Sequence, residues 1–456
     1  MVDEILYVTY LPEAEPRLQR RYDHLVVAQM NELDRIACGL HPPPGEVSQF
    51  AAVQAAWRFY NNPTISLPQL AQPLISYARY ATVLACDGWL LNALDWSLLH
   101  YNGHHSKADR VSLGRKKDLG YTLLTALTLS DRDGRPLAPV CLDMQAAKGV
   151  HSTRAVAPLP AGSRLDDLTD MMGYVEGLKL GRPVVHIIDR EADSVGHYRQ
   201  WHQNNWHFVV RADDNRQVLH NGQARRLDDI AQQMRRDKQF KQLGEVEHKG
   251  QLAWQWVAET TVVLHRPARQ HRVVRGKARH VQVPGPPLAL RLVVSEIRSD
   301  EGRLLARWLL LSNVPLLVAT AMIALWYYWR WRIESYHKLL KSGGYQVEHW
   351  QQETAEALAR RLAVTAMAAA VVWRLARDQR PEAAELRDVL VRLSGRQMKR
   401  GRQARGFTEP ALLAGLGVFV ATLALTDQYT VPTLRRLALR ALPEIFPGIA
   451  VRRESG

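Results

Sequence analysis

The chain has 456 residues and a formal net charge of +15, with 60 Lys and Arg against 45 Asp and Glu. Hydrophobic residues make up 46% of the chain, which is enough to build cores and excludes a globally disordered protein. The length exceeds that of one ordinary domain and predicts two or three. A basic excess of this size favours a polyanionic partner, most simply nucleic acid, over an ordinary basic enzyme.

Three cysteines, Cys38, Cys86 and Cys141, stand far apart without a CxxC pair. This spacing argues against a disulfide framework or a structural zinc site and suits a reducing compartment. The N-terminus lacks the charged start and apolar run of a signal peptide. Residues 315–329 are apolar but too short to span a bilayer, so we expect a buried helix there and no membrane partner.

Residues 1–75 are predicted to form a small basic helical domain. Apolar residues recur at helical intervals from Pro16 to Gly39, HPPPGE at 41–46 breaks the pattern, and a second helix over 47–60 ends at NNP. Basic helical modules of this kind often bind DNA, but they also occur as plain helical caps. The charge of the chain favours DNA binding.

From about residue 80 the pattern is that of an α/β core, predicted to extend from 76 to 375 with an insertion. Strand and helix segments alternate, which is typical of a covered sheet. The expected strands are 81–86, 121–129, 137–142, 183–188 and 207–211, and the expected helices are 165–178 and 194–204.

Residues 213–313 differ, because alternating strands at 252–264, 288–297 and 304–311 enclose the very basic, turn-rich run HRPARQHRVVRGKARH. We expect a β-rich insertion here. The chain is mostly helical after residue 353, and a basic loop at 392–405 lies within a helical C-terminal region predicted over 376–456.

Two acidic segments could carry chemistry. Asp189 directly follows the strand PVVHII, and ligand sites cluster at the C-terminal ends of strands in open α/β sheets. Asp193, in the same DREAD block, is expected to cap a helix or to support the site. A second carboxylate is expected from the preceding segment, where Asp87 and Asp95 compete. Residue chemistry does not separate these two.

The most informative segment is WYYWRWRIESYHKLLKSGGYQVEHWQ at 326–351. It sets Tyr327, Arg330, Glu334 and Lys341 at helical spacings that return to nearly the same side. Alone, such charges usually form a solvated face with weak ion pairs. Together with the two acidic segments, they suit a site in which carboxylates hold two divalent ions ~3.5–4 Å apart against a phosphodiester, and hard oxygen ligands suit Mg²⁺ or Mn²⁺.

Three blocks make the chain resemble a known family. They are LDWSLLHYNGHHSKADR with Asp95, DREAD with Asp189, and the Tyr327, Arg330, Glu334, Lys341 pattern within RWRIESYHKLLKSG. The chain resembles the DDE transposases of the insertion-sequence-four group, to which the transposon-five transposase belongs. The resemblance runs from about residue 10 to about residue 375.

This resemblance implies an α/β fold with an RNase H-like core, a β-rich insertion before the glutamate helix, and flanking helical regions. It implies Asp95 rather than Asp87 as first metal ligand, so that Asp95, Asp189 and Glu334 are the catalytic residues and hold two Mg²⁺ ions, for which Mn²⁺ can substitute. It also implies that Trp308 stacks on a flipped base, a contact worth ~1–3 kcal/mol, although Trp308 also suits a strand core. The residues expected to contact phosphate or DNA are Tyr327, Arg330, Lys338, Lys341, Arg211, Trp308 and Arg58.

The resulting hypothesis is a cut-and-paste DNA transposase. It would cleave the ends of its element, pass through a DNA hairpin and join the freed 3′-OH to target DNA. Its partners would be double-stranded DNA at inverted repeats and at the target, and a second copy of the chain, in the bacterial cytoplasm at the nucleoid. One alternative is a catalytically idle DNA-binding regulator derived from such an enzyme, and another is a nuclease of RNase H-like fold that joins nothing.

Overall fold

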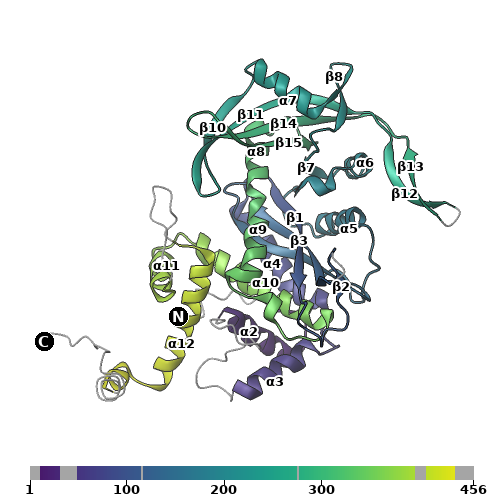
Figure 1. The fold of residues 1–456 in the computed structure, drawn as a ribbon. Helices are drawn as coiled ribbons and strands as arrows, with labels where there is room; N and C mark the ends of the chain where they lie inside the picture. The colour runs from purple at the N-terminus through teal and green to yellow at the C-terminus, as the bar shows by residue number, and fades with distance from the viewer. Residues whose placement is uncertain (1–10, 31–48, 115–116, 275–276, 396–406, 437–456) are drawn as a thin grey trace.

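A computed structural model describes residues 11–30, 49–114, 117–274, 277–395 and 407–436 of the chain. It is a mixed α/β protein with one large sheet and with helices toward both ends of the chain (Figure 1). Some predictions fall outside the described residues: the end of the first helix beyond residue 30, the break at 41–46, Cys38, and the basic loop after residue 395.

Five strands form the centre of the sheet, in the order β4-β3-β1-β6-β7. Strands β1, β3 and β4 are antiparallel neighbours, whereas β6 and β7 run parallel to β1. This is the RNase H-like arrangement, so the predicted fold class is confirmed. The strands are β1 (Leu90–His100), β3 (Leu119–Ser130), β4 (Pro136–Ala146), β6 (Val184–Ile188) and β7 (His207–Arg211), with the short β2 (Val111–Ser112) and β5 (Gly149–Ser152) beside β3 and β4.

The insertion continues this sheet rather than forming a separate one. Strand β15 pairs with β7, and the order then runs β15-β14-β11-β8-β9, with β10 on β11, to give a 13-stranded sheet. The inserted elements are β8 (Gln217–His220), β9 (Gln223–Arg226), α7 (Leu227–Arg236), β10 (Lys241–His248), β11 (Gln251–Leu264), β14 (Leu288–Arg298) and β15 (Leu304–Ser312). A two-stranded ribbon, β12 (Ala268–Val274) and β13 (Lys277–Val283), leaves this sheet between β11 and β14.

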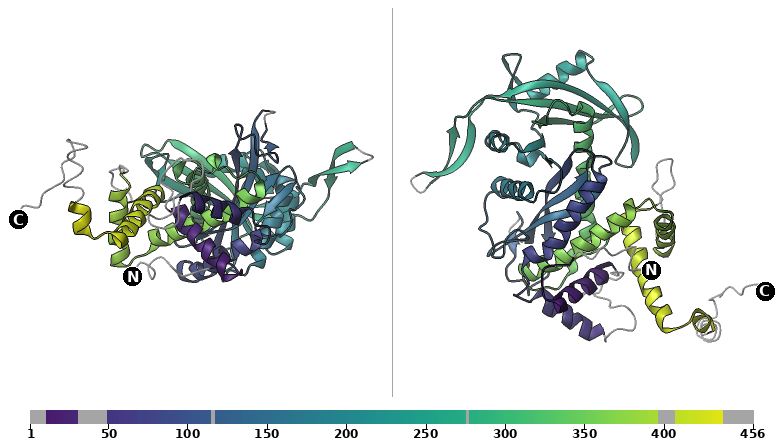
Figure 2. Two further views of the ribbon diagram at one scale, coloured as in Figure 1. Left: turned by 90° about the horizontal axis from the view of Figure 1, so that it is seen from below. Right: turned by 180° about the vertical axis from the view of Figure 1, so that it is seen from behind.

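Helices cover both faces of the central strands (Figures 1 and 2). Helices α4 (Leu67–Ala85) and α10 (Ala355–Arg377) pack against β4, and α5 (Arg164–Gly177) and α6 (Val195–Gln203) cover the other side. The N-terminal helices α2 (Pro16–Met30) and α3 (Gln49–Tyr60) contact α10. Helix α10 is buried on nearly all sides, as its apolar, alanine-rich sequence requires.

Two predicted elements are corrected by the structure. The apolar run at 81–86, predicted as a strand, is the last turn of α4 and its C-cap, and α4 also runs across the boundary expected at residue 75. The helix predicted over 315–329 is α8, which begins only at Thr320 and ends at Trp329. The residues before it form a loop in which Leu316 and Leu317 are 80% and 82% exposed.

The C-terminal region holds α11 (Pro381–Leu393) and α12 (Glu409–Gln428), which contact each other. Among the described residues, α12 is the one helix whose length and apolar composition would allow it to cross a membrane. Its first half is buried, with Leu412 and Leu416 fully covered, as in the core helix of a globular domain.

Candidate active site

Strand register brings the first two candidate carboxylates together. Leu94 of β1 lies opposite Ile188 of the parallel strand β6, so that Asp95 and Asp189 occupy the next positions on neighbouring strands. Each carboxylate also accepts a hydrogen bond from the following backbone N–H, at 2.8 Å from Trp96 and 2.7 Å from Arg190. The local backbone therefore fixes the orientation of both acids.

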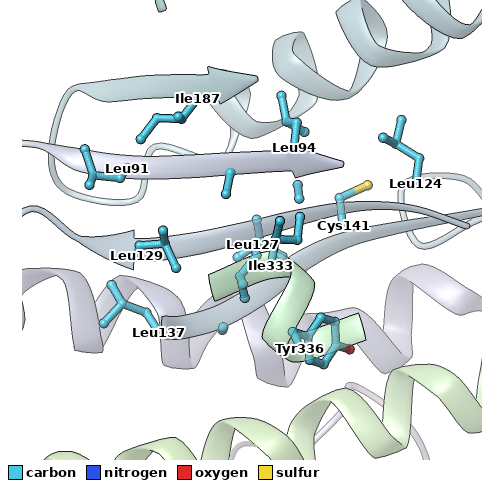
Figure 3. Close-up of a cluster of buried hydrophobic side chains, with 14 of the residues drawn as sticks. Leu91, Leu94, Leu124, Leu127, Leu129, Leu137, Cys141, Ile187, Ile333 and Tyr336 are labelled. Atoms are coloured by element: carbon cyan, nitrogen blue, oxygen red, sulfur yellow. The ribbon is translucent and has the colours of Figure 1, made fainter. Parts of the chain in front are cut away.

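The third carboxylate comes from α9 (Trp331–Lys338), which is held on the sheet by its apolar side. Ile333 and Tyr336 are 0% and 1% exposed, and Figure 3 shows them among the leucines of the core strands. Glu334 lies between these two anchors in sequence and is half-buried. Packing of α9 thus determines where the Glu334 carboxylate can reach.

All three carboxylates converge on one guanidinium group, that of Arg330. Its Nη1 lies 3.1 Å from Asp95 Oδ2, and its Nη2 lies 3.4 Å from Asp189 Oδ2 and 3.0 Å from Glu334 Oε1. The Arg330 side chain is only 4% exposed. Three acidic residues, spread over more than two hundred positions of the sequence from Asp95 to Glu334, therefore meet around a single buried cation.

The protonation equilibria reflect this crowding. Burial raises the pKa of Asp95 above its ordinary value, although Arg330 opposes that effect. Burial likewise raises the pKa of Glu334, and the charge of Asp95 adds to the shift. Burial would also raise the pKa of Asp189, but Arg330, the Arg190 N–H and Arg211 together bring it below its ordinary value. Three clustered carboxylates need a cation among them to remain ionised.

Aromatic and basic side chains surround Asp189. The Tyr327 hydroxyl donates a hydrogen bond to Asp189 Oδ1 at 3.1 Å, and Arg211 Nη1 lies 3.7 Å from the same oxygen. The Trp308 ring lies against Tyr327, with ring centroids 5.6 Å apart, and Trp308 is only 6% exposed. Its burial favours a role as a core residue of β15 in this conformation.

Within the described residues, no ion pair joins the three carboxylates to the other three candidates. Lys341 is half-buried on a π-helical turn, Leu339–Gly343, where its charged neighbour is Glu348. Lys338 is exposed at the end of α9, and Arg58 is exposed on α3. The predicted convergence holds for Tyr327, Arg330 and Glu334, which contact Asp189 or one another. Lys341 follows on the π-helical turn, and burial, Lys341 and Arg330 together lower the pKa of His337.

Asp193 supports the site without capping α6. The helix N-cap is Ser194. The Asp193 carboxylate instead accepts hydrogen bonds from the Asp213 N–H at 2.8 Å, the Tyr198 hydroxyl at 3.0 Å and the Arg216 guanidinium at 3.1 Å. It thereby ties the loop after β6 to the chain that follows β7.

The donor set fits hard divalent cations. Three partly buried carboxylates share one centre, and carboxylate oxygens are the ligands that Mg²⁺ and Mn²⁺ prefer. The Arg330 guanidinium now supplies the positive charge at that centre. Within the described ranges, no group of three or more His, Cys, Asp and Glu side chains stands in a metal-binding arrangement, so the carboxylates would have to exchange Arg330 for the ions.

Sequence reasoning assigned Arg330 to phosphate binding and missed its contacts with all three carboxylates. Arg330 and Glu334 are four residues apart on a helical pattern, and this spacing predicts the ion pair between them. The other two depend on strand pairing and leave no local signal.

Comparison with known proteins gives a family match over most of the chain. The family described as "Transposase DDE domain" matches residues 91–371, a range that contains Asp95, Asp189 and Glu334. Among solved structures, a piggyBac transposase synaptic complex with hairpin DNA is similar at a TM-score of 0.35 and 10% identity, over 95% of this chain and 77% of that one. No curated protein matches the sequence. Because the family match covers more than half of the chain and includes all three acids that meet at Arg330, this protein belongs to the DDE transposases.

Proposed function

We propose that the chain is a metal-dependent cut-and-paste DNA transposase of the insertion-sequence-four group. The observation that carries this proposal is the convergence of Asp95, Asp189 and Glu334 on one buried guanidinium. An acidic trio that has kept this arrangement argues for catalysis and against an idle DNA-binding regulator. The group assignment rests on the Tyr327, Arg330, Glu334 pattern and the DREAD block.

In this proposal Asp95, Asp189 and Glu334 hold two Mg²⁺ ions, for which Mn²⁺ can substitute, and these ions would activate the attacking oxygen and stabilise the leaving one. Arg330 keeps the carboxylates together before DNA binds. When a phosphodiester enters, its oxygens compete for the same guanidinium, and Arg330 can then release the carboxylates. Tyr327 and Arg211 orient Asp189 during that exchange.

The N-terminal helices offer a surface for the DNA ends. A groove of about 820 Å³ opens beside α2 and α3. Its lining contains five basic residues and one acidic residue, Glu15. The basic residues are Arg17, Arg20, Arg21, His24 and Arg58. Such a groove suits the phosphate backbone of a duplex, which supports an end-binding role for the N-terminal region and for Arg58.

Three finer parts of the proposal rest on the resemblance alone. They are the hairpin route, pairing of two copies through the C-terminal helices, and action at the nucleoid of a bacterial cytoplasm. The buried position of Trp308 gives no support to base stacking. A hairpin assay with Trp308→Ala tests that role, because a core residue would lower stability without selectively removing hairpin products.

The central test uses the full chain, Mg²⁺ and a duplex carrying the inverted repeat that flanks the coding region. We expect joined products from the wild-type protein. Asp95→Asn, Asp189→Asn and Glu334→Gln keep side-chain shape but remove a charged ligand, and each should abolish cleavage while DNA binding persists. Glu191→Gln, in the DREAD block but paired with Arg164 at 2.8 Å, should remain active.

The alternatives predict different products. A nuclease would give nicks without joined strands, and a regulator would give only a shifted band. Full cleavage by any one of the three acid variants would refute the assignment of the site.

A further inference from the structure

The ribbon formed by β12 and β13 projects from the body of the molecule (Figures 1 and 2). The two strands pair antiparallel with each other, outside the 13-stranded sheet. At its base the ribbon packs against α6. A two-stranded ribbon is marginal by itself, so this one depends on its anchored base and would be stabilised further by a bound partner.

Every charged residue of the ribbon is basic. Residues 265–287 contain five Arg, one Lys and three His and no Asp or Glu. The register sets Arg272 directly opposite Arg279 and Val274 opposite Lys277. Basic residues without an acidic residue among them favour a polyanionic partner.

A single buried side chain fixes the base of the ribbon. Arg199 of α6 is 7% exposed, and it donates hydrogen bonds to the carbonyl oxygens of Pro286, at 2.8 Å, and Arg266, at 3.0 Å. It therefore ties the chain entering β12 to the chain leaving β13. Gly285 makes this possible, since a Cβ there would lie 2.8 Å from Arg199 Nη1.

The base is also closely packed. Ala268 is 4% exposed, and a Cβ built on Gly196 of α6 would lie 3.2 Å from the Ala268 Cβ. The direction of the ribbon is thus set by α6, which begins only a few residues after Asp189. The ribbon is therefore anchored at its base and carries basic residues, which suits it to contact an anionic surface.

We propose that the β12–β13 ribbon is a DNA-binding arm that contacts the phosphates of a duplex. This inference rests on the proposed function, which supplies DNA as the substrate. Each strand has seven residues, giving a reach of ~23 Å at about 3.3 Å per residue. A two-stranded ribbon fits the major groove of B-DNA. The duplex is either the element end or the target, and both present the same phosphates.

The test compares two triple variants of the full chain. The arm variant carries Arg272→Gln, Lys277→Gln and Arg279→Gln. The control carries Arg236→Gln, Lys238→Gln and Lys241→Gln, at exposed positions elsewhere in the insertion. Each set lowers the formal net charge by three, so a non-specific effect of charge would be equal in both. Melting temperatures establish that both variants fold.

Binding is measured on two duplexes, one carrying the flanking inverted repeat and one of unrelated sequence, over a range of salt concentrations. We expect the arm variant to lose at least ~10-fold in affinity at about 0.1 M salt. The slope of log affinity against log salt should fall by about 3, or roughly 1 for each phosphate that the arm no longer neutralises. The control should stay close to the wild-type protein.

The pattern of loss identifies the duplex. A loss restricted to the inverted repeat assigns the arm to the element end, and a loss on both duplexes assigns it to DNA of any sequence, including the target. Unchanged affinity and salt slope in the arm variant, or an equal loss in the control, would overturn the arm while leaving the transposase proposal intact. A wild-type protein that binds neither duplex would reject both.

Gly285→Ala tests the direction of the ribbon separately from its positive charge. It leaves every cation in place but displaces Arg199 from the base of the ribbon. If the anchored direction matters, this variant weakens DNA binding without the loss in salt slope; wild-type affinity would show that the clamp contributes nothing to binding.

Discussion

At the residue scale, Arg330 makes a prediction that does not depend on activity. Arg330→Gln removes the cation that Asp95, Asp189 and Glu334 share and leaves Arg211 beside Asp189. Breaking a buried ion pair costs ~3–5 kcal/mol, but these carboxylates are 24–39% exposed, so we expect a loss of about 2–3 kcal/mol in unfolding free energy. Millimolar MgCl₂ should then raise the melting temperature of the variant more than that of the wild-type protein.

The matched control is Arg154→Gln. Arg154 pairs with buried Asp143 at 3.1 Å, on β4, which is separated by β3 from β1 and its Asp95. This variant should also be destabilised, but Mg²⁺ should not restore it. Equal effects of Mg²⁺ on both variants, or none on Arg330→Gln, would contradict a divalent-ion site at the convergence point.

The residue scale also shows what the sequence could and could not predict. Tyr327, Arg330 and Glu334 were predictable as one group, because a helical period is a local property. The place of Lys341 relative to this group was not predictable, since the π-helical turn Leu339–Gly343 changes the helical period without an evident signal. Asp95 could not be preferred over Asp87 by chemistry, because what selects it is the pairing of β1 with β6, which joins positions about ninety residues apart.

At the element scale, the error at residues 81–86 has a physical source. An apolar run of this length is compatible with either a strand or a buried helix. The deciding signal lies far upstream, in the capping box in which the Ser66 side chain accepts from the Gln69 N–H and the Gln69 side chain accepts from the Ser66 N–H. A helix started there continues into the apolar run, because only Pro73 interrupts its pattern.

The contact of α11 with α12 gives a prediction in which two effects oppose each other. A Cβ on Gly415 would lie 1.9 Å from the backbone oxygen of Leu390, so Gly415→Ala must force the helices apart, at a cost of ~1–3 kcal/mol. Helix propensity alone would favour Ala by about 1 kcal/mol. We expect overpacking to prevail and α12 to become sensitive to limited proteolysis.

Thr422→Ala, on an exposed turn of the same helix, is the control and should keep α12 protected. Increased protection of α12 in Gly415→Ala would mean that propensity outweighs packing and that the two helices do not approach as closely as described.

At the scale of the whole molecule, the fold was predictable in outline and the continuity of its sheet was not. Strand and helix order predicted the α/β core, and alternation predicted the strands of the insertion. That β15 pairs with β7 and merges both parts into one sheet depends on register between Leu310 and Arg211, which no local pattern encodes. This pairing reaches the candidate site, because Arg211 of β7 lies 3.7 Å from Asp189.

The N-terminal helices contact the core through α10, and Arg360 of that helix adds two hydrogen bonds to the contact. Arg360 is 4% exposed and donates hydrogen bonds to the carbonyl oxygens of Ile65, at 2.9 Å, and Tyr60, at 3.0 Å. Arg360→Met leaves both acceptors buried without this donor, at a cost of ~1–3 kcal/mol each. We expect residues 49–66 to exchange amide hydrogens faster while the strands of the core keep their protection, and binding to the inverted repeat to weaken in parallel.

Arg361→Met is the matched control, because Arg361 instead lies over the Trp350 ring at 4.0 Å. It should lower overall stability without selectively loosening residues 49–66. Equal exchange in both variants would mean that the N-terminal helices are held by their apolar contacts with α10 alone, and that Arg360 does not couple the proposed end-binding region to the active site.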